Sequence, residues 1–330
     1  MPREAAEAFK LPYRVSWPLC FPGMVIMQCI VNFPGRWLDA DQFEAALRNS
    51  VGPHAPEVLE ARFLIPAGCK IMVDAAIRLL SLANQLALTT RRVRLQFDEG
   101  ESGTMGYLNR MGFFDELAKE VEVFPGRPVL SRASLHRGGN VRLVEIARIN
   151  KDFRDEALPT RLTDALLAAS QHSQHGGELG GAAWTIFAEL IDNVFCHSST
   201  RLDGYAALQS YSAGNKLTVA VSDSGLGIMQ TLRPTLHVES PKLMALSDVD
   251  LLVEIFRQGL SRHGAGRGCG LKGSAAKAIK FKAALDVRLP TQRVLLMPAK
   301  GEYRPNTAYC YENLPLIWGT HIGFTFDLKA

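Results

Sequence analysis

Several features that place a protein in a specialised class are missing from this sequence. Its cysteines include no C-x-x-C pair, which argues against a disulfide framework or a zinc site and favours buried, reduced thiols. The six cysteines are Cys20, Cys29, Cys69, Cys196, Cys269 and Cys310. A net charge of +4 over 330 residues is too small to predict a nucleic-acid-binding surface.

Long apolar runs are missing as well. The apolar stretch 19–33 is interrupted by Pro22 and is too short to cross a bilayer. The first residues, Met1 to Glu4, lack the basic-then-apolar pattern of a secretory signal. We therefore expect a cytoplasmic protein that binds neither a membrane nor nucleic acid.

The composition is that of a folded protein. A hydrophobic content of 47% with 21% charged residues argues against disorder. The length of 330 residues suits two domains that each bury a core, and no internal repeat or low-complexity tract is visible. We place the domain boundary near residue 150, where the composition turns polar.

The first 150 residues alternate between strand and helix patterns. An apolar run fills 61–65, and apolar residues at helical spacing follow over 71–88. Residues 92–97 alternate as in a half-buried strand, and a second helix is expected over about 106–117. This order predicts a small α/β domain over residues 1–150.

The sequence pattern over residues 151–330 predicts a second α/β unit. Glycines mark 171–181 as a loop, 229–246 shows no clear period, and Ser247 is expected to cap a helix. The helices are expected over 159–170, 182–197, 248–260 and about 274–282, and the strands over 204–212, 216–222, 285–289, 293–297 and 321–328.

Three short motifs in this second unit could carry chemistry. On the helix 182–197, Glu189, Asn193 and His197 share one face. The Asn193 amide oxygen can ligate Mg²⁺, and the Glu189 carboxylate can deprotonate a water or hydroxyl that attacks phosphorus. Taken alone, the helix favours the simpler interpretation of a solvated face.

The second motif, Asp223-Ser-Gly225-Leu-Gly227, follows a strand. The Asp223 carboxylate can accept the amine hydrogen of adenine there, and the glycines let the backbone approach a flat base. The alternative is an ordinary Asp-Gly turn.

The third motif is a glycine-rich segment before a helix, with Gly264, Gly266, Gly268, Gly270 and Gly273. Glycines before a helix start expose N–H groups that suit phosphates. The segment does not match the dinucleotide fingerprint, because a helix rather than a strand is expected before it.

In this order the motifs resemble the N, G1 and G2 boxes of the GHKL superfamily, which includes gyrase-type topoisomerases, heat-shock chaperones, histidine kinases and mismatch-repair ATPases. The resemblance covers about residues 155–330, and Gly319-Thr320 resembles the family's late G-T element. It implies a Bergerat-type α/β sandwich with a mixed sheet and an ATP lid over 229–264, and it implies ATP and Mg²⁺ as ligands.

The resemblance also implies residue roles. Asn193 would bind Mg²⁺, Glu189 would be the general base, and Asp223 would recognise adenine. The remaining nucleotide-binding positions would be Gly225, Gly227, Gly266, Gly268, Gly270, Leu271 and Thr320. Lys272 could reach a phosphate or simply be solvated.

Three functions stay open. The first is an ATPase or nucleotide-gated switch in bacterial-type signalling. The second is an anti-sigma-type serine/threonine kinase acting on a STAS-like partner, and the third is a non-catalytic ATP-binding interaction module. Glutamate at 189 fits the ATPases and serine kinases, whereas histidine kinases usually carry asparagine there and have an H-E-x-x-x-P motif that neither His172 nor His175 matches.

The partner of such a domain is not named by the sequence. The strand ending at Asp98, followed by Ser102 and a helix, is distantly similar to STAS domains, although the motif is not a clean copy and Ser102 could be a helix cap. We expect a protein partner, and homodimerisation, common in the superfamily, stays open.

Overall fold

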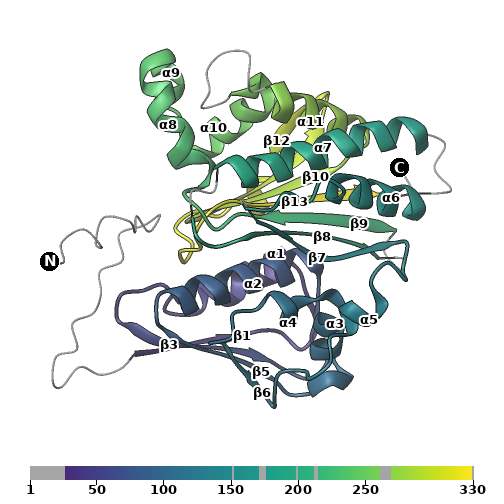
Figure 1. Ribbon diagram of the computed structural model, residues 1–330. Coiled ribbons are helices and arrows are strands. Elements are labelled where there is room, and N and C mark those ends of the chain that lie inside the picture. Colours follow the sequence, from purple (N-terminus) through teal and green to yellow (C-terminus); the bar gives the residue numbers. More distant parts are fainter. Residues whose placement is uncertain are drawn as a thin grey trace, which may run out of the picture.

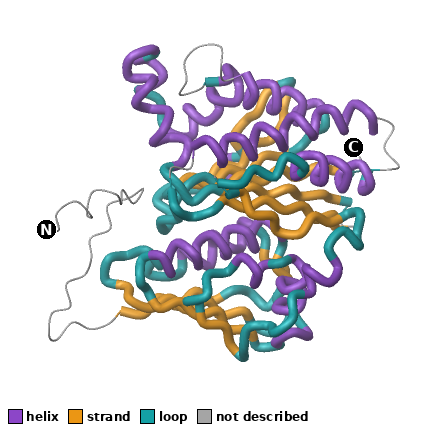
Figure 2. Tube along the Cα trace, viewed as in Figure 1, coloured by secondary structure: helices purple, strands orange, loops and turns teal. Residues whose placement is uncertain are grey.

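Two β-sheets form the framework of the protein. The computed structural model describes residues 27–150, 152–170, 176–197, 200–211, 215–260 and 269–328. A four-stranded sheet has the order β1-β3-β5-β6, and a seven-stranded sheet has the order β12-β11-β10-β13-β9-β8-β7. Figure 1 shows helices between the two sheets and further helices above the larger one, and Figure 2 shows the same layers by type of element. The α/β class is confirmed.

The smaller sheet is entirely parallel. Its strands are β1 (Met27–Asn32), β3 (Val58–Ile65), β5 (Arg92–Phe97) and β6 (Glu122–Phe124), and β2 (Trp37–Leu38) pairs with β4 (Lys70–Ile71). The helices are α1 (Ala40–Arg48), α2 (Val73–Leu88), α3 (Thr104–Met111), α4 (Phe113–Glu116) and α5 (Arg132–His136). Because neighbouring strands follow chain order and crossovers are right-handed, the helices lie on one face.

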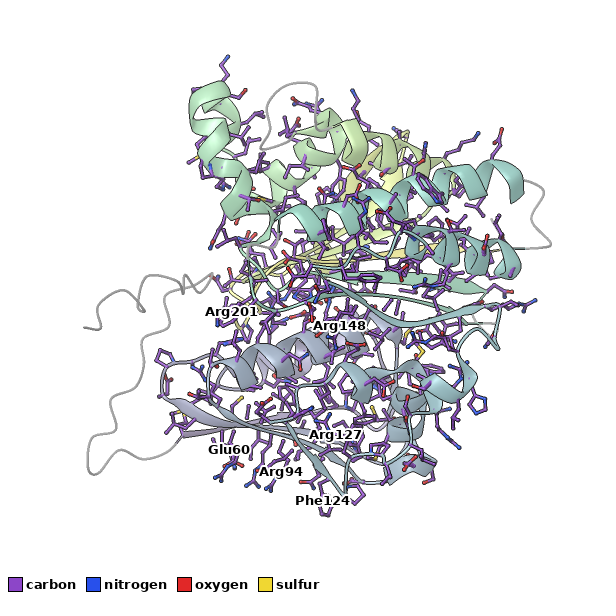
Figure 3. All side chains as sticks on the ribbon, viewed as in Figure 1. Glu60, Arg94, Phe124, Arg127, Arg148 and Arg201 are labelled. Atoms are coloured by element: carbon purple, nitrogen blue, oxygen red, sulfur yellow. The ribbon has the colours of Figure 1, made fainter. Side chains whose placement is uncertain are left out.

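The other face of this sheet carries charged pairs together with the exposed side chains of Ile30 and Phe124. Arg62 pairs with Glu60, and Arg94 pairs with Glu122. Figure 3 shows Glu60, Arg94 and Phe124 on the side of the sheet away from α2. The alternation expected over 92–97 is confirmed as β5, whereas the helix expected over 106–117 is divided by Gly112, whose φ of 81° ends α3.

The larger sheet is antiparallel at every neighbouring pair. Its strands are β7 (Leu143–Ile149), β8 (Gly204–Tyr211), β9 (Lys216–Ser222), β10 (Ala284–Leu289), β11 (Gln292–Ala299), β12 (Glu302–Pro305) and β13 (His321–Asp327). The expected mixed sheet is therefore wrong for this half. Strands β9 and β10 run in the same direction, but β13 inserts between them and pairs antiparallel with both. The strand β7, although it precedes residue 150, belongs to this sheet.

The helices of the second half cover one face of this sheet, as Figure 1 shows. They are α6 (Leu158–Ala169), α7 (Gly176–His197), α8 (Gly227–Glu239), α9 (Pro241–Met244), α10 (Asp248–Glu254), a π-helical turn (Ile255–Gly259) and α11 (Cys269–Lys280). Ser247 caps α10 as expected, since its side chain accepts from the Asp250 N–H. The segment 229–246, which showed no clear period, is also mostly helical.

The loop expected over 171–181 is wrong for 176–181, which form the first turns of α7, while 171–175 lie outside the described residues. Packing explains the difference. A Cβ on Gly180 would meet Leu167 of α6 at 3.1 Å, so the glycine allows the two helices to approach closely. The glycine that suggested a loop is therefore a packing residue.

The helix α2 lies between the two sheets and is buried along most of its length. Its Arg78 joins the halves of the chain by pairing with Glu44 of α1 at 3.1 Å and with Asp286 of β10 at 2.5 Å. Asp286 also pairs with Arg293 at 2.6 Å. Burial acts to raise the pKa of Asp286, but Arg78 and Arg293 together hold it below its ordinary value.

We expect Arg78→Ala to lower the free energy of unfolding by about 3 kcal/mol, because it removes one partner from buried carboxylates. Urea titration followed by circular dichroism measures this. Arg62→Ala is the matched control, since it breaks a partly exposed pair and is expected to cost about 1 kcal/mol or less. Equal losses in the two variants would contradict the role of Arg78.

Candidate functional site

The ends of β9 and β13 bring Asp223 and Thr320 together. Ser222 is paired with His321 in the sheet register, and the Asp223 N–H donates to the Thr320 carbonyl at 3.0 Å. The neighbouring Gly319 has a φ of 86°, and a Cβ there would lie 1.9 Å from the Asp223 carbonyl oxygen. Only glycine permits this approach. Residues about one hundred positions apart thus share one end of the sheet.

A partly open pocket lies beside these two residues. Its walls come from α7, α8 and the ends of β9 and β13, and we call it the Asp223 pocket. The apolar lining residues are Leu190, Val194, Val221, Ile228 and Ile322, and the others are Asn193, Asp223, Gly227, Thr231 and Thr320. An apolar cavity with a few convergent polar groups is the usual form of a small-molecule site.

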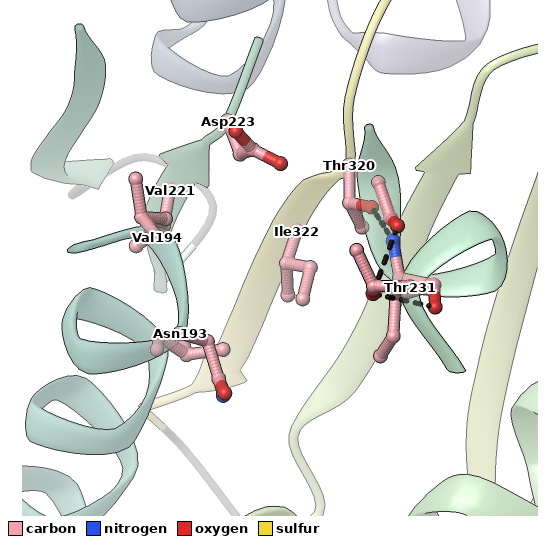
Figure 4. A pocket seen from close by; sticks show the side chains of 10 residues that line it. Asn193, Val194, Val221, Asp223, Thr231, Thr320 and Ile322 are labelled. Carbon is pink, nitrogen blue, oxygen red and sulfur yellow. Dashed lines mark hydrogen bonds between the residues drawn. The ribbon is translucent and has the colours of Figure 1, made fainter. Parts of the chain in front are cut away.

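Figure 4 shows how the polar groups lie around the pocket. Asp223 and Asn193 come from different elements and lie apart in this view, with Val194 and Val221 on one side of the space between them and Ile322 on the other. Thr320 and Thr231 lie on another side. The polar groups thus surround a space whose walls are mostly apolar.

Asp223 is a buried carboxylate, with 7% of its surface exposed. Burial raises its pKa to about 6, and the backbone hydrogen bonds from Gly225 and Thr320 lower it only in part. The Gly225 N–H donates to Asp223 Oδ1 at 2.7 Å. At neutral pH the pocket therefore holds a mostly ionised acceptor in an apolar setting.

The hydroxyl of Thr320 is also fixed in place. Its Oγ1 accepts from the Ile228 N–H at 2.9 Å and retains its own hydrogen for donation. Gly227, just before Ile228, has a φ of 78°, and a Cβ there would lie 3.2 Å from Thr320 Oγ1. The second glycine motif thus shapes the start of α8 around Thr320.

Asn193 and Glu189 both belong to α7, but only Asn193 lines the pocket. Asn193 lines the pocket, and its buried Nδ2 has no hydrogen-bond partner among the described residues. Glu189 stands one turn earlier and is not a lining residue. Its pKa is raised by burial and by the nearby charge of Asp192. The Asn193 Nδ2 is therefore a donor that the described part of the fold leaves available at the pocket wall.

The third motif is described only in part. Gly266 and Gly268 lie outside the described residues, while Gly270 and Leu271 belong to the first turn of α11.

The direction of α11 follows from its contacts with α7. Lys277 donates to Thr185 at 2.7 Å, and Lys280 pairs with Glu178 at 2.6 Å. The two helices therefore run antiparallel, which directs the first turn of α11 toward the Glu189–Asn193 end of α7.

The segment expected to be a lid, 229–264, is helical over its described part, and 261–264 lie outside the described residues. Arg233 of α8 makes hydrogen bonds that hold this segment together. Its guanidinium donates to the carbonyls of Met244 and Leu246 at 2.9 and 3.0 Å and to Asp248 Oδ1 at 3.1 Å. The same residue thus connects α8 with the turn before α10.

The sequence did not reveal every residue of the site. Thr231 lines the pocket from α8, in the segment 229–246 that shows no visible period, and Ile228 lines it from just before that segment. Gln85 of α2, in the other half of the chain, contacts Ser224 directly after Asp223 and Trp318 two residues before Thr320. No local sequence pattern marks Gln85.

Comparisons with known proteins add no relative. Scans against protein-family models, curated proteins and solved structures each found no match. Among the described residues, no helix is long and apolar enough to cross a membrane, and no group of three or more His, Cys, Asp or Glu side chains is placed to hold a metal ion. The site is therefore interpreted from its own geometry.

Asp223→Asn is expected to stabilise the protein at neutral pH. The pKa is about 6 in the folded protein against an ordinary value of 3.8, so the folded state favours the protonated carboxyl. Ionisation therefore opposes folding increasingly as the pH rises from about 4 to 6, by up to about 3 kcal/mol above that range. Asparagine avoids this cost and still accepts from Gly225.

Chemical denaturation of both proteins between pH 4 and 8 measures the difference. The gain should be near zero at pH 4 and complete above pH 6. Asp286→Asn is the control of opposite sign, because Asp286 is paired with two arginines and its replacement should destabilise. A gain for Asp223→Asn that does not depend on pH would rule out the carboxylate as its source.

Proposed function

We propose that the Asp223 pocket binds ATP with Mg²⁺, and that residues 143–328 form a GHKL-type nucleotide-binding domain. The observation that carries this proposal is the buried, mostly ionised Asp223 carboxylate beside the Thr320 hydroxyl, at one end of a mostly apolar pocket. The carboxylate suits the exocyclic amine of adenine, and the apolar walls suit the faces of its ring.

The phosphate end of the ligand is supported by α7 and α11. The buried Asn193 Nδ2, which has no hydrogen-bond partner among the described residues, could donate to a phosphate oxygen. The Oδ1 of the same amide could then ligate Mg²⁺, which takes few protein ligands and keeps its phosphates and waters. The first turn of α11 is directed toward the same end of α7, and a helix start offers N–H groups to phosphate. The bound ion would neutralise phosphate charge.

Hydrolysis is the activity that we assign to this site. The raised pKa of Glu189 brings its basicity closer to neutral pH, which suits a general base, and Glu189 is one turn from Asn193. A second function is favoured by one observation: Glu189 does not line the pocket. That placement favours a nucleotide-binding interaction module without catalysis.

Binding is tested by isothermal titration calorimetry of the full chain with ATP and Mg²⁺. Asp223→Asn is expected to weaken binding by about tenfold or more, since a hydrogen bond to a charged acceptor is replaced. Asp155→Asn, on an exposed pair with Arg161, is the control and should bind like wild type. Wild-type protein that gives no heat of binding would overturn the proposal.

Hydrolysis is tested by phosphate release under saturating ATP. Glu189→Gln should reduce the rate by about a hundredfold while ATP binding changes by about twofold or less, because the base is lost and the pocket is kept. Glu156→Gln, an exposed carboxylate, is the matched control.

The distribution of γ-phosphate separates the three functions. Release into water supports the ATPase, and label on protein supports a kinase. A wild-type rate no higher than that of Glu189→Gln supports the binding module.

A further inference from the structure

Gln85 of α2, a fully buried side chain, reaches from the N-terminal half to the loops beside the Asp223 pocket. Its Nε2 donates to Ser224 Oγ at 3.0 Å and to the Trp318 carbonyl at 3.1 Å, and the Trp318 N–H donates to its Oε1 at 2.9 Å. Ser224 directly follows Asp223, and Trp318 stands two residues before Thr320. One carboxamide therefore joins the two loops that carry the polar groups of the pocket.

A second contact from the same helix lies on the other side of Asp223. Ser81 Oγ and Ser222 Oγ are 2.8 Å apart. Four residues along a helix rise about 6 Å, and two residues along a strand rise about 6.6 Å. The spacing of Ser81 and Gln85 thus matches that of Ser222 and Ser224, and α2 holds the residues before and after Asp223.

The orientation of Gln85 is itself fixed. His54 Nε2 lies 3.3 Å from Gln85 Oε1, and the His54 ring stacks on Trp318 with centroids 4.9 Å apart. Burial and then the charge of Arg91 lower the pKa of His54 to about 3, so the ring is neutral. Because a carboxamide oxygen only accepts, His54 Nε2 is the donor. These contacts hold the Gln85 carboxamide in one orientation.

We propose that Gln85 is a positioning residue that sets the adenine selectivity of the Asp223 pocket. It fixes the Asp223 and Thr320 loops relative to each other, so that both present their polar groups to the same ligand edge. The inference rests on the proposed function. It assigns part of nucleotide recognition to a residue of the N-terminal half, which touches no ligand itself.

The test compares ATP with purine riboside triphosphate, which lacks the 6-amino group, by calorimetry with Mg²⁺ on the full chain. The dissociation constant of purine riboside triphosphate divided by that of ATP measures recognition of the 6-amino group. Gln85→Met keeps the length of the side chain and removes its hydrogen bonds, and it should lower the ratio by about tenfold. A general loss of stability would weaken both ligands alike and leave the ratio unchanged.

Asn84→Leu is the matched control, because it removes a buried amide from the neighbouring position of the same helix. Asn84 donates to Tyr205 of β8 at 2.8 Å and to the Glu116 carbonyl at 3.0 Å, and it contacts neither pocket loop in these hydrogen bonds. Its ratio should stay within about twofold of wild type, although thermal melting should show a comparable loss of stability.

Ser224→Ala tests the role of Gln85 if Gln85→Met does not fold. It removes one hydrogen bond of Gln85 and leaves the two bonds to Trp318, so the ratio is expected to fall by about threefold. Selectivity retained in whichever of the two variants folds would overturn the role of Gln85 while leaving ATP binding intact. Wild-type protein that binds both triphosphates equally would overturn this inference, and wild-type protein that binds neither would overturn the proposed function with it.

Discussion

The burial of α2 between two sheets is the constraint on which the other parts of the structure depend. A helix covered on both sides has no water to satisfy its polar groups, so each buried polar side chain must find a partner in a neighbouring element. Arg78, Ser81 and Gln85 find theirs on the larger sheet and its loops. These bonds fix where the helix sits along β9 and β10. The two halves of the chain are thus joined by directional contacts as well as by apolar packing, and the core of the first half includes Tyr205 and Ala220 of the second.

The insertion of β13 between β9 and β10 is what assembles the pocket. A strand near the end of the chain lies beside one formed about one hundred residues earlier, and their paired ends place Thr320 next to Asp223. Gly319 makes the approach sterically possible. The same insertion makes the sheet antiparallel throughout. The strand order therefore determines both the antiparallel topology of the sheet and the proximity of Asp223 and Thr320. A change in the strand order would separate the two loops that carry them.

Local sequence patterns were sufficient to predict an element where the burial of one of its faces determines its structure. The strands over 92–97 and 216–222 were predicted to the residue, because each shows alternation or is bounded by turn residues. Such patterns failed where distant contacts decide. Glycines suggested a loop at 176–181, but Gly180 serves the contact of α7 with α6. Asn193, Asp223 and Thr320 were predicted from motifs, and the structure places them around one pocket. Gln85 could not be found in this way, because a glutamine on a helix normally indicates a solvated face.

Two buried aspartates differ in how far the fold compensates their charge. Asp286 has two arginine partners, and its pKa is held below the ordinary value despite burial. Its charge is therefore compensated by the fold. Asp223 has only backbone N–H groups to offset burial, and its pKa is raised to about 6. A protein selected for stability alone would place an asparagine or an apolar residue there, since ionisation at neutral pH opposes folding. Under the proposed function a ligand supplies the missing donor, and an amine-bearing ring between apolar walls meets that requirement.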